Sequence, residues 1–473
     1  MTEPSERCPD REKNEEQEVV FMEKDTTIGT QKLAALFDAG TFAEIGAYVR
    51  RSDGKNSGAV CGYGAVGGKL VYAFAQDSDR EKGAFDLTTA KKLHMLYETA
   101  MRNGAPVVGI FDSIGAYMTD GADAMAAYGS LLADVSRASG VIPQIALIDG
   151  VCAGLSATAA AMFDLTVTVA EKSRLFVGAP FLTGKDGGSD SAAADGLSSV
   201  TAKDGQDALE KVRTLLGLLP SSCAALPEEI GNDDLNRTVQ IGGLAVRDMI
   251  ASLADGGSFV EIGGKFGAGM VTGLAMLGGY PCGVVANDAA VAGGVLTADG
   301  ARKAAKLVSL CNCFGLPVVT LVDSEGVAVN AKEESAPLAA ELGKLAMIYA
   351  AANVAKITVI TGKAYGAAFT LMGSKALGAD LVYALDGATV SVMKPEAAVA
   401  FLWNDRITET VTRAELVKKW TDEEASAVRA AESGAVDDIL NPADLRKYLC
   451  GAVNMLLCKD EATLTRKHCN LPL

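Results

Sequence analysis

The chain has 473 residues, enough for two or three domains, and 49% of them are apolar, so each domain can bury a large core. The formal net charge of −16 argues against nucleic-acid binding, which needs a dominant basic surface. Only two histidines are present, so a catalytic machine built on histidine is not expected.

The sequence carries no signal for export or for a membrane span. The first 25 residues hold nine acids and four bases without an apolar core, and residues 141–170 are interrupted by Asp149 and Asp164. The ten cysteines are scattered through apolar segments, as reduced core cysteines usually are. Cys311 and Cys313 form a close pair without a second pair, which favours core packing over a zinc site. We therefore expect a cytoplasmic protein without a bound metal.

In chain order, residues 1–24 are acidic and predict a mobile tail, and residues 25–220 predict a first domain. The expected elements of that domain are a helix at 30–39, a strand at 42–49, two strands around a Gly-Gly turn at 59–77, a helix at 87–103, a strand at 106–112, a helix at 121–139, a strand at 142–149, a helix ending at Phe163, a strand at 165–170 and a helix at 206–220. The Gly/Ser/Asp-rich stretch 184–206 predicts a loop or lid, and 221–238 a connector.

Residues 239–473 repeat the first pattern and predict a second domain of the same kind. LFDAGTFAEIG (36–46) matches LADGGSFVEIG (253–263), and NGAPVVGIFDSIGA (103–116) matches FGLPVVTLVDSEGV (314–327). The expected elements are two strands at 271–288, helices at 297–314 and 336–352, strands at 318–323, 356–361 and 380–385, a turn and helix at 363–377, and charged helices beginning at Thr412 and Thr421. The alternation predicts an α/β fold with largely parallel strands, present twice.

Two strand–turn–helix junctions at equivalent places are the strongest candidates for chemistry. The first turn covers residues 150–155 and the second covers residues 362–368, and both are rich in Gly and Ala. The first N–H groups of a helix lack intrahelical partners, so such a turn can hold a developing oxyanion. Losing one such donor costs about 2.7–4 kcal/mol of barrier in a known enzyme. Tight packing of helix on sheet also selects small residues, and the repetition favours the catalytic interpretation.

Other polar residues allow two interpretations. Asp112-Ser113 and Asp323-Ser324 end equivalent strands, where α/β sheets bind ligands, although an Asp there can also cap a helix. Tyr365 is either a polar contact or part of the core. Arg302, Lys303 and Lys306 share one predicted helix, for which a solvated charged face is favoured over a phosphate site.

Two segments of the second half resemble a known family. RKAAKLVSLCNCFGLPVVTLVD (302–323) and the segment 355–399, with its K-A-Y-G-A-A and S-K-A-L-G-A-D motifs, closely resemble carboxyltransferase subunits of biotin-dependent acyl-CoA carboxylases and of sodium-pumping acyl-CoA decarboxylases. CGYGAVGGKLVYAFAQD and SGVIPQIALIDGVCAG in the first half are similar to the same family with less specific motifs. The resemblance covers roughly residues 30–403.

The resemblance implies two tandem crotonase-like domains with acyl-CoA on the first and carboxybiotin, held by a carrier protein, on the second domain of a partner subunit. Gly154 and Leu155 match the pair that holds the thioester enolate oxygen, and Gly366, Ala367 and Ala368 match the turn that faces the biotin ureido oxygen. Thr370 matches a position that tunes acyl-chain choice. The remaining expected substrate contacts are Ala153, Ser113, Gly115, Ala116 and Tyr365. Carboxybiotin would lose CO2, its freed nitrogen would take the α-proton, and the enolate would attack CO2.

The implied partners are a biotin carboxyl carrier protein, a biotin carboxylase or a membrane decarboxylase subunit, and further copies of the chain, from dimer to hexamer. A decarboxylase would sit at the periphery of a membrane complex. The first half departs from the family pattern, because Leu155 replaces a Gly, and Ile114 and Tyr117 replace a Gly and an Arg. Two alternatives therefore stay open: a diverged non-catalytic scaffold, and a crotonase-type hydratase or isomerase, which needs a Glu pair near the first turn.

Overall fold

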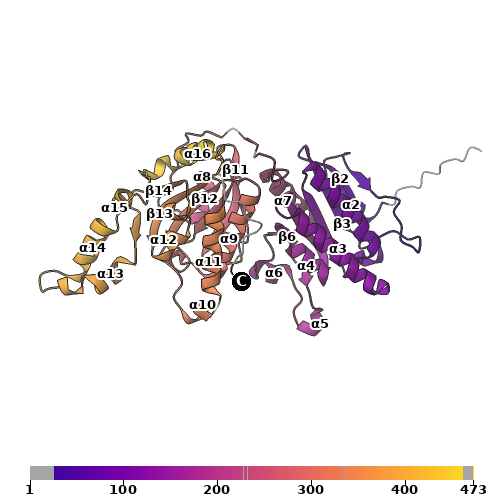
Figure 1. Ribbon diagram of the computed structural model, residues 1–473, viewed down its shortest axis with the longest axis horizontal. Helices are drawn as coiled ribbons and strands as arrows, with labels where there is room; N and C mark the ends of the chain where they lie inside the picture. The colour runs from indigo at the N-terminus through magenta and orange to yellow at the C-terminus, as the bar shows by residue number, and fades with distance from the viewer. Residues whose placement is uncertain (1–25, 227, 232, 336, 462–471, 473) are drawn as a thin grey trace, which may run out of the picture.

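A computed structural model describes residues 26–226, 228–231, 233–335, 337–461 and 472, so the predicted tail at 1–24 lies outside the described residues. Figure 1 shows two lobes side by side, each a sheet with helices on both faces. The elements of the first lobe precede α8, and those of the second follow it. No helix or strand occurs among the described residues of the interval 219–245, which includes the predicted connector.

The first sheet has the strand order β1-β2-β3-β4-β5-β6-β8, with β7 paired to β5. The strands β1 to β3 pair antiparallel, and the other neighbours are parallel. The elements are α1 (Ile28–Leu36), β1 (Ala43–Ile45), β2 (Ala59–Val66), β3 (Lys69–Gln76), α2 (Leu87–Asn103), β4 (Val107–Ser113), α3 (Ala122–Ala138), β5 (Gln144–Ala153), α4 (Leu155–Ala161), β6 (Leu165–Val169), β7 (Arg174–Phe176), α5 (Pro180–Thr183), α6 (Ser189–Ala194), β8 (Val200–Ala202) and α7 (Gly205–Leu218).

The second sheet repeats this order as β9-β10-β11-β12-β13-β14-β16, with β15 paired to β13. The fold is therefore two tandem crotonase-like α/β domains, as predicted. Its elements are α8 (Val246–Leu253), β9 (Val260–Glu261), β10 (Met270–Leu277), β11 (Tyr280–Asn287), α9 (Ala298–Cys313), β12 (Val318–Ser324), α10 (Ala331–Ser335), α11 (Leu338–Ala351), β13 (Lys356–Tyr365), α12 (Ala367–Leu371), β14 (Leu381–Leu385), β15 (Thr389–Ser391), α13 (Pro395–Leu402), α14 (Arg413–Glu424), α15 (Ala427–Glu432), β16 (Asp438–Leu440) and α16 (Leu445–Leu456).

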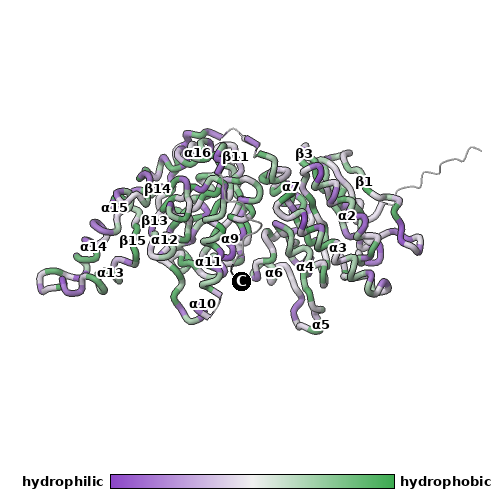
Figure 2. Tube along the Cα trace, in the orientation of Figure 1, coloured by the Kyte–Doolittle hydropathy of each residue, from purple (hydrophilic) through white to green (hydrophobic). Residues whose placement is uncertain are grey.

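Burial of strand and helix faces explains the distribution of apolar residues along the sequence. All eight residues of β10 are buried, as expected for a strand covered on both faces, and Figure 2 shows hydrophobic residues concentrated in such strands. Residues of α2, α3 and α4 pack on one face of the first sheet. Residues of α1 and α7 form a core on the other face that continues into α9 and α11 of the second domain. The two domains therefore share one apolar interior.

Two predicted elements were wrong. The stretch 184–206 is not a free loop, because it contains α6, whose Ala192 and Ala193 are buried, and β8, which pairs with β6. The helix expected over 363–377 is the short α12. It ends before Gly373, where a Cβ would come within 2.9 Å of the Thr358 hydroxyl.

Of the two helix starts predicted after residue 404, one is correct and one is wrong. Thr412 caps α14 with a capping box, in which Glu415 accepts the Thr412 N–H at 2.8 Å. Thr421, the other predicted start, lies inside α14, and its hydroxyl donates to the Val417 carbonyl at 3.0 Å. The next helix, α15, begins after Ser426 instead.

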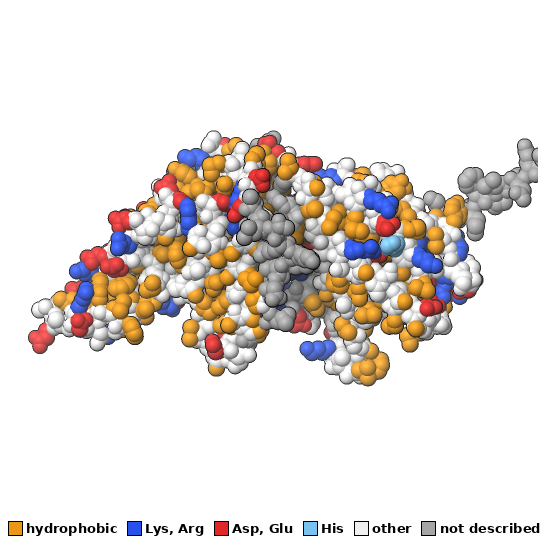
Figure 3. Space-filling view, in the orientation of Figure 1, with side chains coloured by type: hydrophobic (Ala, Val, Ile, Leu, Met, Phe, Trp, Pro, Cys, Tyr) orange, Lys and Arg blue, Asp and Glu red, His pale blue; other side chains and the backbone are white. Residues whose placement is uncertain are grey.

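The described residues include no helix that is long and apolar enough to cross a membrane. Exposed apolar side chains lie on two arms, namely α5, which follows β7, and α13, which follows β15. Phe181 on α5 is 86% exposed and Phe401 on α13 is 82% exposed. Figure 3 shows apolar side chains along the lower edge of both lobes.

Candidate functional site

The two predicted turns have the same backbone conformation. Gly154 has φ 61° and ψ −127°, and Gly366 has φ 56° and ψ −137°, values that only glycine adopts without strain. Each glycine precedes a helix, α4 or α12. The N–H of Gly154 donates to the Phe176 carbonyl and that of Gly366 to the Ser391 carbonyl, both at 2.9 Å. The glycines therefore set the direction of the turn and are not themselves the donors that face a ligand. The first N–H groups of the two helices, at Leu155 and Ala367, are left for that role.

An aspartate at the end of the preceding strand holds each turn in place. Asp112 Oδ1 accepts the Val151 N–H at 3.4 Å, and Asp323 Oδ1 accepts the Lys363 N–H at 2.9 Å. At both places the register between neighbouring strands shifts, as in a bulge. Gly150 and Gly362 are needed there, because a Cβ would come within 2.1 Å of Asp112 Oδ1 or 2.5 Å of Asp323 Cγ. The aspartates thus act on the sheet, and neither caps a following helix.

The loop after β4 lies against the first turn, and the loop after β12 lies against the second. Ser113 Oγ accepts the Gly115 N–H at 3.0 Å, and Ser324 Oγ accepts the Gly326 N–H at 3.2 Å. A Cβ on Gly115 would lie 3.7 Å from the Ala153 carbonyl. Ala116, the next residue, pairs with Phe85 in a bridge. The predicted residues Ser113, Gly115, Ala116 and Ala153 are therefore brought together at the first turn.

A cavity of about 840 Å³ opens beside the second turn. Its lining includes Gly366, Ala367 and Thr370, together with Trp420. Ala368 is fully buried in the core and does not line it. Tyr365 is 6% exposed, and its hydroxyl shares a 2.9 Å hydrogen bond with Thr389, so it braces the strand pair β13–β15 from within. The other walls of the cavity are aromatic, apolar and charged, the charged residues being Glu424 and Arg429.

Comparison with known proteins assigns the chain to a family. The family model described as "Carboxyl transferase domain" matches residues 23–471. The chain belongs to the carboxyl transferase domain family. It is 32% identical to the methylmalonyl-CoA decarboxylase subunit alpha of Veillonella parvula, over 94% of this chain and 92% of that protein. It is 33% identical to a putative propionyl-CoA carboxylase beta chain of Bacillus subtilis, over 94% and 93% of the two chains.

A solved structure agrees with this family in fold as well as sequence. Transcarboxylase 12S, described as a hexamer with methylmalonyl-coenzyme A and methylmalonic acid bound, has a TM-score of 0.89 and 30% identity. The match covers 94% of this chain and 92% of that one. The chain is therefore a carboxyltransferase with two tandem domains, as the sequence predicted.

In this carboxyltransferase the two turns are far apart within one chain. Figure 1 places α4 in one lobe and α12 in the other. The predicted site residues thus form two groups, one at each turn. A reaction that uses both groups at once needs the second group from another copy of the chain.

Several residues near the turns were not found from the sequence. Lys32 of α1 contacts Asp112 Oδ2 at 3.1 Å and Asp149 Oδ2 at 2.8 Å. Burial lowers the pKa of Lys32, but the hydrogen bond and charge of Asp149 more than offset this, so its pKa is raised. Arg51 stacks over the Tyr117 ring at 3.8 Å and pairs with Asp86 at 2.9 Å. These contacts join residues at least 35 positions apart, and no local sequence motif indicates them.

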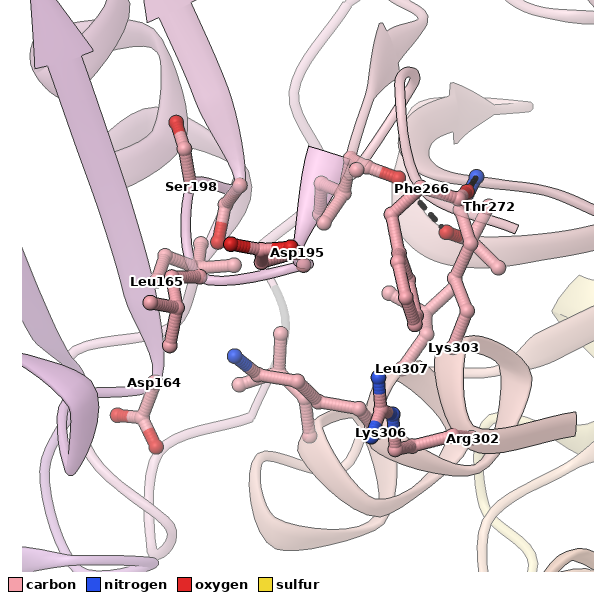
Figure 4. Close-up of a pocket in the computed structure, with 16 residues that line it drawn as sticks. Asp164, Leu165, Asp195, Ser198, Phe266, Thr272, Arg302, Lys303, Lys306 and Leu307 are labelled. Carbon is pink, nitrogen blue, oxygen red and sulfur yellow. Dashed lines mark hydrogen bonds between the residues drawn. The ribbon is translucent and has the colours of Figure 1, made fainter. Parts of the chain in front are cut away.

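A second cavity, of about 270 Å³, lies between the domains and is lined by residues away from both turns (Figure 4). The prediction of a solvated face on this helix, α9, is correct for Arg302 and Lys306, which are exposed, and wrong for Lys303. Lys303 is 6% exposed, and its Nζ donates to the Phe266 carbonyl at 2.9 Å and to the Met270 carbonyl at 2.6 Å. Burial lowers the pKa of Lys303 to about 8. Its ammonium group therefore ties a loop of the second domain to α9.

Within the described residues, no three His, Cys, Asp or Glu side chains gather in a way that could hold a metal ion. Cys311 is buried in α9, and Cys313, two residues later, is exposed. The carboxylates of Asp112 and Asp149, near the first turn, are instead both paired with Lys32.

Proposed function

We propose that the chain is the carboxyltransferase subunit that moves a carboxyl group between biotin on a carrier protein and the α-carbon of a short acyl-CoA. Acyl-CoA substrates of the propionyl/methylmalonyl type are favoured, because the relatives named above act on them. Acyl-CoA substrates of the acetyl/malonyl and glutaconyl types are the other candidates. The observation that carries the proposal is the repeated turn, in which a glycine at positive φ presents the first N–H groups of a helix at equivalent places of both domains.

The first turn would stabilise the enolate oxygen of the acyl-CoA. Leu155 N–H is the donor proposed at α4, and Ala116 N–H, from the adjacent loop, is proposed as the second. Preorganised backbone donors of this kind lower a barrier without histidine. The carboxylates nearest this turn, Asp112 and Asp149, are both paired with Lys32, and Asp112 also accepts a backbone N–H. This pairing argues against the hydratase alternative, which needs carboxylates free for proton transfer.

The second turn would bind biotin, whose fit is supported by the cavity of about 840 Å³ beside it. Ala367 N–H would face the ureido oxygen, and Trp420, Phe369 and Val392 offer apolar surface for the ring and its side arm. When bound, biotin supplies a nitrogen that carries the carboxyl group and afterwards accepts the α-proton. The chain's part is to hold the two oxygens, align the substrates and exclude water.

The two turns would meet across an interface between subunits. The proposed assembly is a dimer, extended to a hexamer as in the related transcarboxylase 12S. The exposed apolar arms α5 and α13 are suited to such contacts, since large exposed apolar patches mark interaction sites. The proposed partners are a biotin carboxyl carrier protein and either a biotin carboxylase or a membrane decarboxylase subunit.

A transfer assay tests the function. The purified chain is incubated with a carrier protein bearing labelled carboxybiotin and with acetyl-, propionyl- and crotonyl-CoA, and labelled acyl-CoA is measured. We expect label on at least one thioester, and methylmalonyl-CoA labelled in its free carboxyl group should transfer label to an unlabelled biotinyl carrier. Absence of transfer in both directions with every thioester, while the chain still assembles, would favour the scaffold alternative.

A further inference from the structure

Three charged side chains form a bridge next to the second turn. Glu325, in the loop after β12, accepts a hydrogen bond from Lys363 of β13 at 2.7 Å through Oε1. Its other oxygen, Oε2, accepts from Lys394, which lies just before α13. Both lysine side chains are about half exposed, at 48% and 50%. One carboxylate between two ammonium groups leaves a local charge of plus one in a chain whose formal net charge is −16.

The backbone of this Lys363–Glu325–Lys394 cluster touches the turn itself. Lys363 lies on β13, three residues before Gly366, which follows the end of that strand. A Cβ on Gly326, beside Glu325, would lie 3.7 Å from the Tyr365 carbonyl. A Cβ on Gly366 would lie 3.3 Å from the carbonyl of Val392, two residues before Lys394. The cluster therefore lies beside the second turn, close in the chain to Gly366 and Val392, which line the cavity.

The first domain has the same backbone at these positions without the charges. Ile114 corresponds to Glu325, since the two N–H groups donate to the Lys82 and Gly293 carbonyls respectively. Val151 corresponds to Lys363, since each N–H is held by the aspartate described above. Ala179 corresponds to Lys394, since each precedes a proline that opens a helix. The same backbone conformation forms at the first turn with Ile114, Val151 and Ala179. It therefore does not require charged side chains at these positions.

We propose that the Lys363–Glu325–Lys394 cluster binds the carboxylate of the group that is presented at the second turn, namely the carboxyl carried on the ureido nitrogen of biotin. This inference rests on the proposed function. That carboxyl is an anion until its C–N bond breaks and neutral CO2 departs, and the electron pair then stays on the ureido group. A fixed positive charge beside the turn holds the anion in place before that step. Glu325 keeps both ammonium groups together. The uncharged residues at the three equivalent positions of the first turn suit a thioester enolate that receives neutral CO2.

Calorimetry measures this recognition without any turnover. The probes are the methyl ester of biotin and the same ester with a carboxymethyl group on one ureido nitrogen, a stable charged analogue. We expect the full chain to bind the charged analogue more tightly than the uncharged ester. Lys363→Met and Lys394→Met should each weaken binding of the charged analogue by about fivefold, the upper value for one exposed ion pair, and leave the uncharged ester unaffected. Added salt should reduce the preference of the unchanged protein.

Two further variants separate binding from a merely structural bridge. Lys375 also pairs with a carboxylate, that of Asp437, and is 40% exposed, so Lys375→Met is the matched control and should bind both probes normally. Glu325→Gln removes the one negative charge and should tighten binding of the charged analogue. A bridge that only braces β15 predicts a lower Tm in all three cluster variants with equal affinity for both probes, which would overturn the inference.

Steady-state kinetics connects the cluster to transfer. Both lysine variants should raise KM for the carboxybiotinyl carrier by about the same fivefold factor and leave KM for acyl-CoA unchanged. Normal transfer with an unchanged KM for the carrier in both variants would overturn the inference and leave the proposed function standing. If the unchanged protein transfers nothing, the proposed function fails, and the calorimetric preference alone still decides whether the cluster binds a carboxylate.

Discussion

Single residues carry the geometry of the two turns, and glycine is required at more places than the turn itself. Gly150 and Gly362 lie four residues before Gly154 and Gly366, where the carboxylates of Asp112 and Asp323 occupy the space of a Cβ. The sequence showed small residues at these positions but not the reason for them. The reason is a carboxylate from a neighbouring strand.

Replacement of Gly362 tests this packing. In Gly362→Ala the new methyl group meets Asp323 Cγ at 2.5 Å, so the strand or the carboxylate must move. We expect a loss of about 1–3 kcal/mol in the free energy of unfolding, as for other overpacked sites, and slower transfer because the strand leads to Gly366. Urea unfolding measures the change. Gly451→Ala in α16 is the control, since its Cβ meets nothing within 4 Å. Its stability should rise by about 0.5–1 kcal/mol, and equal stability of the two variants would contradict the explanation.

Lys303 gives the chain a pH-dependent stability. Its pKa is about 8 in the folded chain against an ordinary value of 10.5, because burial disfavours the charged form. Between these pH values the unfolded chain binds more protons than the folded chain, so the free energy of unfolding rises with pH. The rise amounts to at most about 3 kcal/mol.

The difference between the protein and its Lys303→Met variant isolates this group from other alkaline titrations. Urea unfolding from pH 7 to 10.5 should show the unchanged protein gaining stability relative to the variant across the window above pH 8. Lys265→Met, at a side chain that is 57% exposed, is the control for loss of a lysine at the surface. A flat difference curve for Lys303→Met would mean that burial does not lower the pKa of Lys303.

At the scale of elements, α14 depends on Thr412, the residue that caps its N-terminus. Thr412 and Glu415 form a capping box, and the helix carries Trp420, which lines the cavity beside the second turn. Thr412→Ala should cost about 1 kcal/mol of local stability. Because the helix and Trp420 would then fray earlier, tryptophan fluorescence should change at a lower temperature than the circular dichroism of the whole chain. Thr421→Ala, inside the same helix, should leave the two transitions together.

The sequence predicted the elements whose signal is local and continuous. Residues 87–103 have an apolar stripe of helical period, and α2 spans those same residues. The strand after it was predicted as well, because it is an apolar run bounded by turn residues. The bulge between Ile148 and Cys152 was missed, since β5 continues through it only because Asp112, far away in the chain, accepts the Val151 N–H. The short β8 and α6 were missed for another reason, because three to six residues carry too little pattern against a Gly/Ser-rich background.

The candidate site was also predictable only where its residues lie close together in the sequence. The small residues of both turns stand out because they occur twice, and the family motifs add the likeness of the second turn to known carboxyltransferases. The Lys363–Glu325–Lys394 cluster was not predictable, because its members are separated by 38 and 69 positions. Lys303 was assigned to a solvated face, and only the contact between α9 and the loop that carries Phe266 reveals its burial.

At the scale of the whole molecule, the duplication separates two tasks that one domain would have to combine. The backbone is the same at both turns, and the residues around them differ: Ile114, Val151 and Ala179 at the first, and Glu325, Lys363 and Lys394 at the second. Each chain holds its two turns in different lobes (Figure 1). In a symmetric dimer, the first turn of one subunit can face the second turn of the other. Such a dimer would bring together two turns that each chain holds in different lobes, and it would create two equal sites.

Mixing two inactive variants tests that arrangement. Gly154→Val and Gly366→Val each place a branched side chain at a positive φ, so each should abolish transfer when assembled alone. In a mixed dimer one site receives both damaged turns and the other receives both intact turns. Chains mixed in equal amounts, dissociated and reassembled at random should therefore recover about a quarter of the unmodified activity, because half of the dimers are mixed and each has one intact site. Recovery should require dissociation, and mass photometry should show unchanged assembly of each variant. If the two turns of a single chain formed the site, every site in every mixture would contain one damaged turn, and reassembly would restore nothing.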